Sequence, residues 1–483
     1  MRVAQFRFSR LILILPVLLA GVLGSVGPAA AQETNGENLP ILSLRECVDL
    51  ALQSSPSLMI SEERRFIAAK DVTGAKGAFL PDVSLSHRWS KSERTDYDVD
   101  DRTFSNEAFY TYDSAGDSTM WFQQVSVLNG LTDETVSSTY KDFGGQASLN
   151  LFAGFSKFAN LSAAKNNLSA AEATRDYTRE LVVQDVTMAY FNLLRYNRLL
   201  VVANDSRDQA AKELERTETY FRLGSAAKSD VLQQRVRLEN TKLDVVVADN
   251  NVKKAFVDLA YAMNRPLVAA FRVDFSVLDT DFQVEDVESL YMEALDSRLD
   301  LTSNEYYLQA RQNDVTSASS NLLPRVDLNV SHTRYTNDSP FKFGSQKSGS
   351  TSWGYSVSWN IFDRMQTLTG RSKAKANARI AQYELEQARM NVQVEIRQLH
   401  NNLVEARERA NVSRETIIQS EEELRLAQER FRVGAGTTLD IITAQVNLAN
   451  SRAQEVQAMC DFLIGEAQLE RAVGRVSSYG RDM

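Results

Sequence analysis

The feature that most constrains this chain is an internal duplication, in which one pattern of residues occurs twice. The later part of each copy repeats at an offset of 210 residues, and the earlier part at an offset of 243. The matching segments are Phe221-Arg222-Leu223-Gly224 with Phe431-Arg432-Val433-Gly434, Asp230-Val231-Leu232 with Asp440-Ile441-Ile442, Asp71-Val72-Thr73 with Asp314-Val315-Thr316, and Leu80-Pro81 with Leu323-Pro324. The difference of 33 residues indicates a net insertion in the first copy, between about 90 and 145. The chain therefore consists of two copies of one structural unit, repeat 1 (about 44–264) and repeat 2 (about 287–474).

Both repeats are expected to contain unusually long helices. No proline lies between Pro81 and Pro266, or after Pro340, so nothing in these stretches forces a helix to break. Good helix formers dominate them, and apolar residues recur three and four positions apart. The predicted helices cover about 44–78, 157–222, 228–264, 287–321, 367–432 and 438–474. A helix of about 65 residues extends on the order of 100 Å, which indicates a coiled-coil-like assembly.

Four shorter runs alternate between apolar and small polar residues, as transmembrane β-strands do. They cover about 81–90, 145–154, 324–335 and 352–362. An ordinary half-buried sheet of a soluble domain would give the same alternation. The tryptophans favour the membrane interpretation, because all of them fall in or between these runs. Trp89, Trp353, Tyr355 and Trp359 are therefore candidates for membrane-interface aromatics.

The other face of each run carries mostly Ser, Asn, Asp and Gly, which suits a water-filled lumen. The segments 91–143 and 336–351 are rich in Asp, Ser, Thr, Tyr and Gly and are predicted as external loops. Four strands cannot close a barrel around a lumen, and open strand edges are not tolerated in lipid. The sequence therefore predicts a membrane α+β fold whose β-barrel is shared between several chains.

The first 31 residues are expected to be a secretory signal peptide rather than part of the fold. Three arginines precede an apolar core from Leu11 to Leu23, and Ala29-Ala30-Ala31 forms a small-residue cleavage site. The apolar core is shorter than the roughly 20 residues that a spanning helix needs. The mature chain would then be 32–483, and no cysteine follows the cleavage site to carry a lipid anchor.

Charge and composition argue against several classes of function. Loss of the three signal-peptide arginines changes the formal net charge from -9 to -12, which disfavours binding to nucleic acid. Cys47 and Cys460 are more than 400 positions apart and are expected to be small buried residues, not a disulfide or a metal site. We find no catalytic or nucleotide-binding motif, so no enzyme activity and no cofactor are predicted.

The order, duplication and spacing of these segments resemble the TolC-type outer-membrane efflux proteins over nearly the whole mature chain. The resemblance rests on Leu42-Ser43-Leu44, on Ala51 to Leu58, on the two β-hairpins, and on the two Phe-Arg-x-Gly turns, each followed six residues later by Asp. It implies a homotrimer with a 12-stranded barrel surrounded by outer-membrane lipid. It also implies a long periplasmic α-helical barrel below the membrane.

In that family, the turns at the far end of the helices contact a periplasmic adaptor protein that leads to an inner-membrane pump. The resemblance assigns this contact to Arg222, Leu223, Gly224, Ser225, Arg432, Val433, Gly434 and Ala435. It makes Asp230 and Asp440 candidates for a periplasmic gate that selects against anions. The sequence departs from the family at Thr443 and Gly436, where a second acidic residue and a gate-locking arginine can stand.

Structural explanations compete with these assignments. Both tip glycines can be helix C-caps that need positive φ, and Asp440 in Thr437-Thr438-Leu439-Asp440 can belong to a capping box. At the level of function, the main hypothesis is a passive exit duct for small molecules or a polypeptide, as in tripartite efflux or type I secretion. The alternative is a periplasmic or surface coiled-coil scaffold, which leaves the four alternating runs unexplained.

Overall fold

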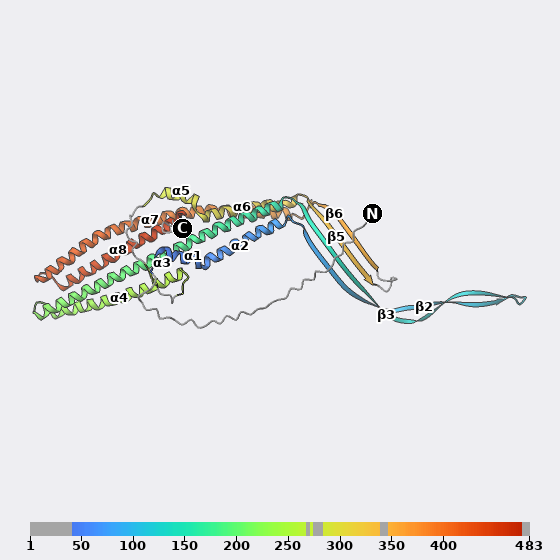
Figure 1. Ribbon diagram of the computed structural model, residues 1–483, viewed down its shortest axis with the longest axis horizontal. Coiled ribbons are helices and arrows are strands. Elements are labelled where there is room, and N and C mark those ends of the chain that lie inside the picture. Colours follow the sequence, from blue (N-terminus) through green and yellow to red (C-terminus); the bar gives the residue numbers. More distant parts are fainter. Residues whose placement is uncertain (1–40, 267–270, 274–283, 339–345, 476–483) are drawn as a thin grey trace, which may run out of the picture.

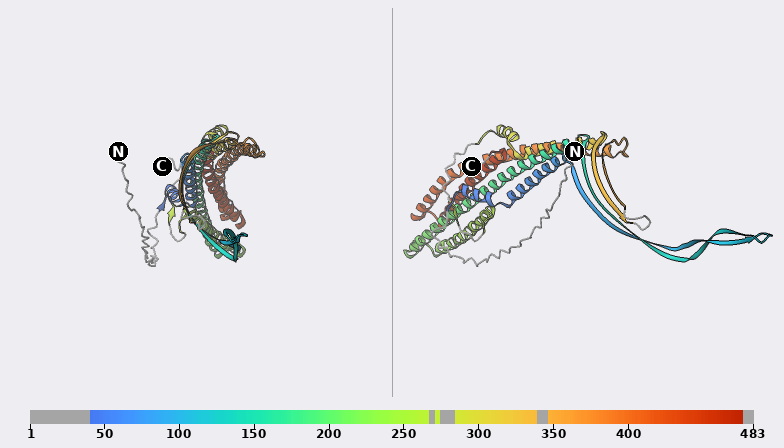
Figure 2. Two further views of the ribbon diagram at one scale, coloured as in Figure 1. Left: turned by 90° about the vertical axis from the view of Figure 1, so that its right-hand side faces the viewer. Right: turned by 45° about the vertical axis from the view of Figure 1, so that its right-hand side comes forward.

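A computed structural model describes residues 41–266, 271–273, 284–338 and 346–475 of the chain. The predicted signal peptide lies outside these residues. Figure 1 shows an elongated molecule with the helices at one end and the strands at the other. In Figure 2 the helices form a curved layer, and the sheet continues this curvature. The predicted combination of long helices, one antiparallel sheet and an internal duplication is confirmed.

The helices occur in the same order in both repeats. Repeat 1 contains α1 (Leu44–Ser54), α2 (Pro56–Gly77), α3 (Ser156–Arg222) and α4 (Lys228–Ala262). Repeat 2 contains α5 (Val287–Ser297), α6 (Leu299–Ser319), α7 (Gln366–Arg432) and α8 (Thr438–Val473). The two longest helices, α3 and α7, contain 67 residues each, so each extends about 100 Å. In the described parts of the chain, no helix combines the length and apolarity needed to cross a bilayer.

The predictions of single helical stretches over 44–78 and 287–321 need correction, because each stretch is divided in two. In repeat 1, Pro56 begins α2 and holds the preceding Ser55 in an extended conformation with ψ of 118°. At the matching position of repeat 2, Arg298 is extended with ψ of 124°. This position has no proline to explain its conformation.

Long-range ion pairs hold Arg298 instead. Its side chain is almost fully buried and donates to the Asp300 carboxylate at 2.8 Å and to Glu395 of α7 at 2.7 Å. It also donates to the Ala472 carbonyl of α8 at 3.0 Å, and Arg471 pairs with the same Glu395. The break between α5 and α6 is therefore fixed by two other helices of the repeat.

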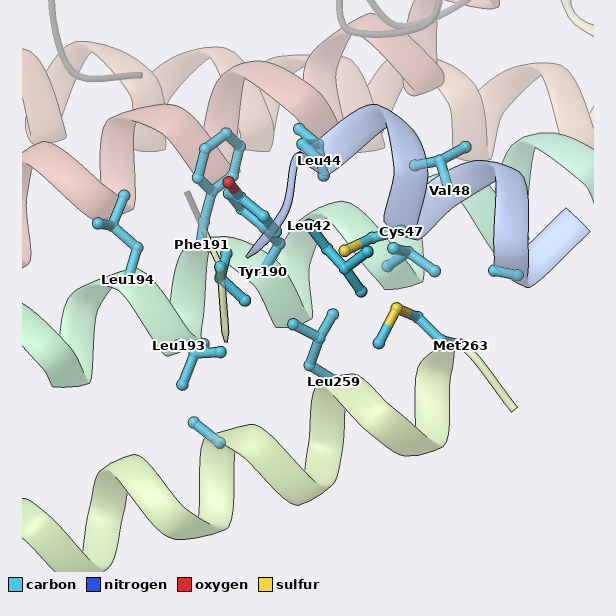
Figure 3. Close-up of a cluster of buried hydrophobic side chains, with 14 of the residues drawn as sticks. Leu42, Leu44, Cys47, Val48, Tyr190, Phe191, Leu193, Leu194, Leu259 and Met263 are labelled. Carbon is cyan, nitrogen blue, oxygen red and sulfur yellow. The ribbon is translucent and has the colours of Figure 1, made fainter. Parts of the chain in front are cut away.

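Apolar contacts between the helices form two main clusters. The first joins α1, α3, α4 and α8 around Tyr190, Phe191, Leu259 and Met263 (Figure 3). A parallel pair of two-residue strands, β1 (Ile41–Leu42) and β4 (Arg272–Val273), lies beside it. The second joins α5, α6, α7 and α8, and both clusters lie away from the hairpin tips. Cys47 and Cys460 are free and buried within the first cluster, as predicted.

The sheet contains β2 (Asp82–Tyr112), β3 (Ser118–Ala153), β5 (Arg325–Asp338) and β6 (Gln346–Ser358). Its order is β2-β3-β5-β6, and every neighbouring pair is antiparallel. Among the residues that the structure describes, β2 and β6 each have one strand neighbour, so both outer edges of the sheet are unpaired there.

The prediction of an external loop over 91–143 is wrong. The two strands continue through this segment as a paired ribbon, and only Asp113–Asp117 forms the turn between them. The composition of the segment includes many Thr and Tyr residues, which favour extended strands. Cross-strand hydroxyl bonds such as Thr95 to Thr135 contribute to the pairing. The loop predicted over 336–351 is likewise shortened by β5 and β6, and 339–345 lies outside the described residues.

Candidate functional site

The two faces of the sheet differ sharply in polarity. In an antiparallel sheet, directly paired residues point to the same face. The register pairs Val83 with Ala147, Ala147 with Val330, and Val330 with Trp353. By this register one face, here called the apolar face, carries Val83, Leu85, Trp89, Phe143, Leu149, Phe152, Val326, Leu328, Val330, Trp353, Tyr355 and Val357. Farther from the helices the same face also carries His87, Lys141, His332, Arg334 and Thr336. Many are strongly exposed, including Trp353 at 80% and Tyr355 at 76%.

The opposite face is polar and bonded across the strands. It carries Asp82, Ser84, Ser86, Gln146, Ser148, Asn150, Asp327, Asn329, Ser331, Ser352 and Ser356. The hydroxyls of Ser331 and Ser352 lie 2.8 Å apart, and the Asn150 amide donates to Asp327 at 2.8 Å. An apolar outer face with a polar inner face is the arrangement of a transmembrane barrel around water.

The predicted interface aromatics fall at different levels of the apolar face. Trp89 pairs with Lys141, which in turn pairs with Thr336, so Trp89 and Thr336 lie at the same level of the sheet. Trp359 directly follows the last residue of β6, which pairs with Arg325. These levels are about 12 strand positions apart, or about 40 Å along a strand and about 30 Å at a tilt of about 40°. That height is comparable to the hydrocarbon core of a bilayer, and His332 and Arg334 lie on this face in the part of the span nearest Trp89. Trp353 and Tyr355 lie between the two levels, within the strip rather than at its edge.

The helical hairpins α3–α4 and α7–α8 end in two similar turns, at the end of the molecule opposite the sheet (Figure 1). Gly224 and Gly434 both have φ of 78°, so the predicted C-cap glycines are confirmed. In each turn, the following residue donates its backbone N–H across the turn at 2.8 Å, from Ser225 to Tyr220 and from Ala435 to Arg430. The glycines therefore set the shape of both tips.

All eight residues assigned to the adaptor contact are exposed at these tips. Leu223 is 73% exposed and Val433 is 66% exposed, so each turn presents an apolar side chain to solvent. The rings of Tyr220 and Phe431 lie 6.0 Å apart between centroids. This ring contact brings the two tips into one surface.

The two candidate gate residues both serve as helix caps. The Asp230 carboxylate accepts the Ala227 N–H at 2.9 Å, which is half of a capping box. Asp440 completes a full box with Thr437, whose N–H and hydroxyl both donate to its carboxylate at 2.8 Å. These bonds hold the pKa of the exposed Asp440 carboxyl below its ordinary value, and the nearby Arg430 adds to the effect. The capping alternative is thus confirmed for Asp440, and the gate role stays a prediction.

The interiors of the two hairpins differ. The α3–α4 hairpin buries Gln234 completely, with neither amide atom hydrogen-bonded, and Glu213, with one carboxylate oxygen unbonded. The matching position of Gln234 in the α7–α8 hairpin is Ala444, which packs in a small apolar cluster with Ile441. Buried polar groups without partners weaken packing. The α7–α8 hairpin also buries unbonded polar atoms, Thr438 Oγ1 and Gln445 Oε1, so the difference is confined to the position of Gln234 and Ala444.

Sequence reasoning missed a pocket where β3 meets α3. Its volume is about 170 Å³, and it is lined by Phe79, Leu149, Asn150, Leu151, Phe152, Ala153, Phe155, Lys157 and Phe158. The signal was available in the repeat, because Leu149 and Lys157 differ from their counterparts Trp359 and Thr367. Among the described residues, no group of three or more His, Cys, Asp or Glu side chains could hold a metal ion.

Comparison with known proteins relates this geometry to one family. Residues 47–265 and 290–475 match the family described as outer membrane efflux protein. The chain is 20% identical to outer membrane protein TolC of Vibrio cholerae over 471 residues, which is 96% of each chain. The CmeC outer membrane channel of Campylobacter jejuni aligns with a TM-score of 0.69 at 17% identity, over 91% of this chain and 88% of that one. The open MtrE channel of Neisseria gonorrhoeae aligns with a TM-score of 0.67 at 19% identity, over 90% and 89%.

Proposed function

Because the chain belongs to the outer membrane efflux protein family, we propose that it is the exit duct through which a pump discharges its cargo. The protein lies in the outer membrane, with its helices in the periplasm. Cargo would be small molecules or a polypeptide, and conduction would be passive. The sheet is the observation that supports the proposal most directly. It has a polar face, and it is joined to a curved layer of long helices (Figure 2), as the wall of a water-filled duct would be.

The duct would be assembled from three copies of the chain. In the described part of one chain, the outer edges of β2 and β6 have no strand neighbour, and such edges are not stable in lipid. Pairing β2 of one copy with β6 of the next satisfies both edges. Three copies then supply 12 strands, enough to enclose a lumen. The homotrimer is the arrangement that the resemblance to the TolC-type proteins implies.

The hairpin tips would receive a periplasmic adaptor that links the duct to an inner-membrane pump. The exposed Leu223 and Val433 give each tip an apolar contact, while Arg222 and Arg432 add exposed charge beside them. The shared surface created by the Tyr220–Phe431 contact would let one adaptor hairpin touch both turns. The energy for export would come from the pump.

The periplasmic entrance would be gated near Asp230 and Asp440. Both carboxylates lie in the first turn of a helix that starts at the tip. In a trimer, three Asp440 carboxylates near one axis would attract cations and repel anions. Because local hydrogen bonds keep the Asp440 carboxyl ionised, its charge would persist at neutral and mildly acidic pH.

Single-channel recording in planar bilayers tests the proposal. Detergent-purified mature protein should give discrete, cation-preferring conductance steps. Asp440→Ala should reduce the cation preference or enlarge the steps. Asp71→Ala removes an exposed carboxylate of α2, at the opposite end of the helices from the tips, and should change neither property. Steps unaffected by Asp440→Ala would keep the channel and exclude Asp440 as its constriction. Protein that never inserts and is stable without detergent would instead support a coiled-coil scaffold.

A further inference from the structure

The pocket at the β3–α3 junction has aromatic walls. Phe79 and Phe158 meet edge to face with ring centroids 5.2 Å apart, and Phe152 and Phe155 meet in the same way at 5.3 Å. All four phenylalanines line the pocket, together with Leu149 and Leu151. Phe155 is 55% exposed and Phe158 is 62% exposed, so the aromatic wall opens to the outside of the chain.

One cation stands in this apolar setting. Lys157 is the only charged residue that lines the pocket, and its ammonium lies 5.7 Å from the centre of the Phe79 ring. The ammonium donates to the Asn150 carbonyl, and its charge also acts on the Asp327 carboxylate of the neighbouring strand. An ammonium has three N–H donors, so this bond leaves capacity for an anionic group.

The pocket lies at the border of the apolar face that is nearest the helices. Leu149 pairs with Leu328, and Phe152 pairs with Val326, so both belong to that face. The junction between strands and helices follows immediately (Figure 1). Lys157 is thus placed where a lysine side chain can keep its charge at the headgroup level while its stem contacts apolar surface.

The duplication supplies a natural comparison for this pocket. At the position of Leu149, repeat 2 has Trp359, whose indole N–H donates to the Leu322 carbonyl at 3.1 Å. Leu322 itself occupies the position of Phe79. At the position of Lys157, repeat 2 has Thr367, which bonds to the Asp363 carboxylate of its own turn. Repeat 2 therefore has an indole where repeat 1 has Leu149, and a threonine where repeat 1 has Lys157.

We propose that this pocket binds a phospholipid of the periplasmic leaflet, with an acyl chain against the phenylalanines and the phosphate on Lys157. An apolar wall beside a single cation, at the border of a membrane-facing strip, matches an amphiphile with an anionic head. A free phosphate ion would find one partly exposed lysine and no second donor side chain with a charge. The site is independent of conduction and requires only the outer-membrane location.

Lipid binding can be measured by native mass spectrometry of the detergent-purified full-length protein, titrated with phosphatidylglycerol. The wild-type protein should retain one tightly held lipid per chain. Leu149→Trp copies repeat 2 and should abolish this binding. Lys157→Gln should weaken it about fivefold, as expected for one lysine near a lipid headgroup. Lys165→Gln, which alters an exposed lysine on the same helix, should bind like the wild type.

Equal lipid occupancy in the wild type, Leu149→Trp and Lys157→Gln would overturn the proposal. So would an equal loss in Lys157→Gln and Lys165→Gln, because charge alone would then explain retention. The titration is repeated in the presence of millimolar inorganic phosphate. Displacement of the lipid by phosphate would contradict the proposal, because it would indicate an anion site without an acyl-chain contact. If Leu149→Trp fails to fold, the two lysine variants still decide. A protein that binds lipid here but does not conduct would leave this site standing and remove the exit-duct function.

Discussion

Gly154 allows a sharp test of the structure, because its substitution should cost more than that of Gly224 or Gly434, the positive-φ glycines at the hairpin tips. Its φ is 57°, and a Cβ added to it would lie 2.1 Å from the Ser320 carbonyl oxygen and 2.9 Å from the carbonyl carbon. Gly224 has φ of 78°, but a Cβ there would meet nothing within 4 Å. The two sites share the backbone cost and differ in the contact.

The magnitude follows from these two effects. A left-handed conformation costs an ordinary residue about 1–2 kcal/mol, which applies to both glycines. At Gly154 the new carbon must also move about 1 Å from the Ser320 oxygen to reach a normal separation, and such overpacking adds about 1–3 kcal/mol. Arg364, the repeat 2 counterpart of Gly154, has φ of 56°, so this junction can carry a side chain where the carbonyl contact is absent.

Thermal unfolding of the detergent-purified protein, followed by far-ultraviolet circular dichroism, measures the difference. Gly154→Ala should lower the midpoint at least twice as far as Gly224→Ala. Gly434→Ala should match Gly224→Ala, since its φ and open surroundings are the same. A Gly154→Ala midpoint equal to that of Gly224→Ala would refute the reasoning, because the Ser320 contact would then carry no cost.

Three further changes test the helices by the same melting assay. Burial raises the pKa of Glu180 from 4.5 to about 7, so the wild type loses stability as pH rises between these values. Glu180→Gln has no carboxyl to ionise, so its melting temperature should rise relative to that of the wild type between pH 5 and pH 8. The pKa of Asp440 is lowered, so its carboxylate stabilises the folded protein above pH 3.8, and this stabilisation is lost as pH falls below that value. Asp440→Asn should therefore lose less stability than the wild type when the pH is lowered below 3.8. Gln234→Met, which replaces an unbonded buried amide, should stabilise the α3–α4 hairpin by about 1 kcal/mol.

Each of these changes has a clear contrary result. A constant difference between Glu180→Gln and the wild type from pH 5 to pH 8 would show that this carboxyl does not titrate there. Parallel acid melting curves for Asp440→Asn and the wild type would remove the role of the capping box. A lower midpoint for Gln234→Met would mean that the buried amide has partners, such as bound water, that stabilise the hairpin. Glu215→Gln, on an exposed face of α3, serves as a control.

The features that could be predicted from the sequence are those set by local pattern. Alternation of side chains fixes the face to which each strand residue points, so Val83 and Trp353 could be assigned to one face before the pairing was known. The turns at Gly224 and Gly434 could be predicted because a helix that ends in a glycine needs only its own last residues to form the cap.

The features that escaped prediction depend on residues distant in the sequence. The helix break at Arg298 exists because of Glu395, 97 positions away, and the Ala472 carbonyl. The ribbon beyond residue 91 forms because Ser92 and Ser138, or Thr95 and Thr135, meet across two strands, which composition alone does not reveal. The pocket beside Lys157 likewise requires the meeting of Phe79 with Phe158.

The matched lengths of the helices restrict how this chain can change in length. The helices α3 and α7 have 67 residues each, and α4 and α8 have 35 and 36. One residue inserted into α3 would displace one tip by about 1.5 Å and rotate every later side chain by about 100° out of its packing position. The β2–β3 ribbon has no such counterpart to match, since β5 and β6 have only 14 and 13 residues. Insertions, deletions and displayed epitopes should therefore be tolerated near Gly116 at the ribbon turn and rejected within the helical columns.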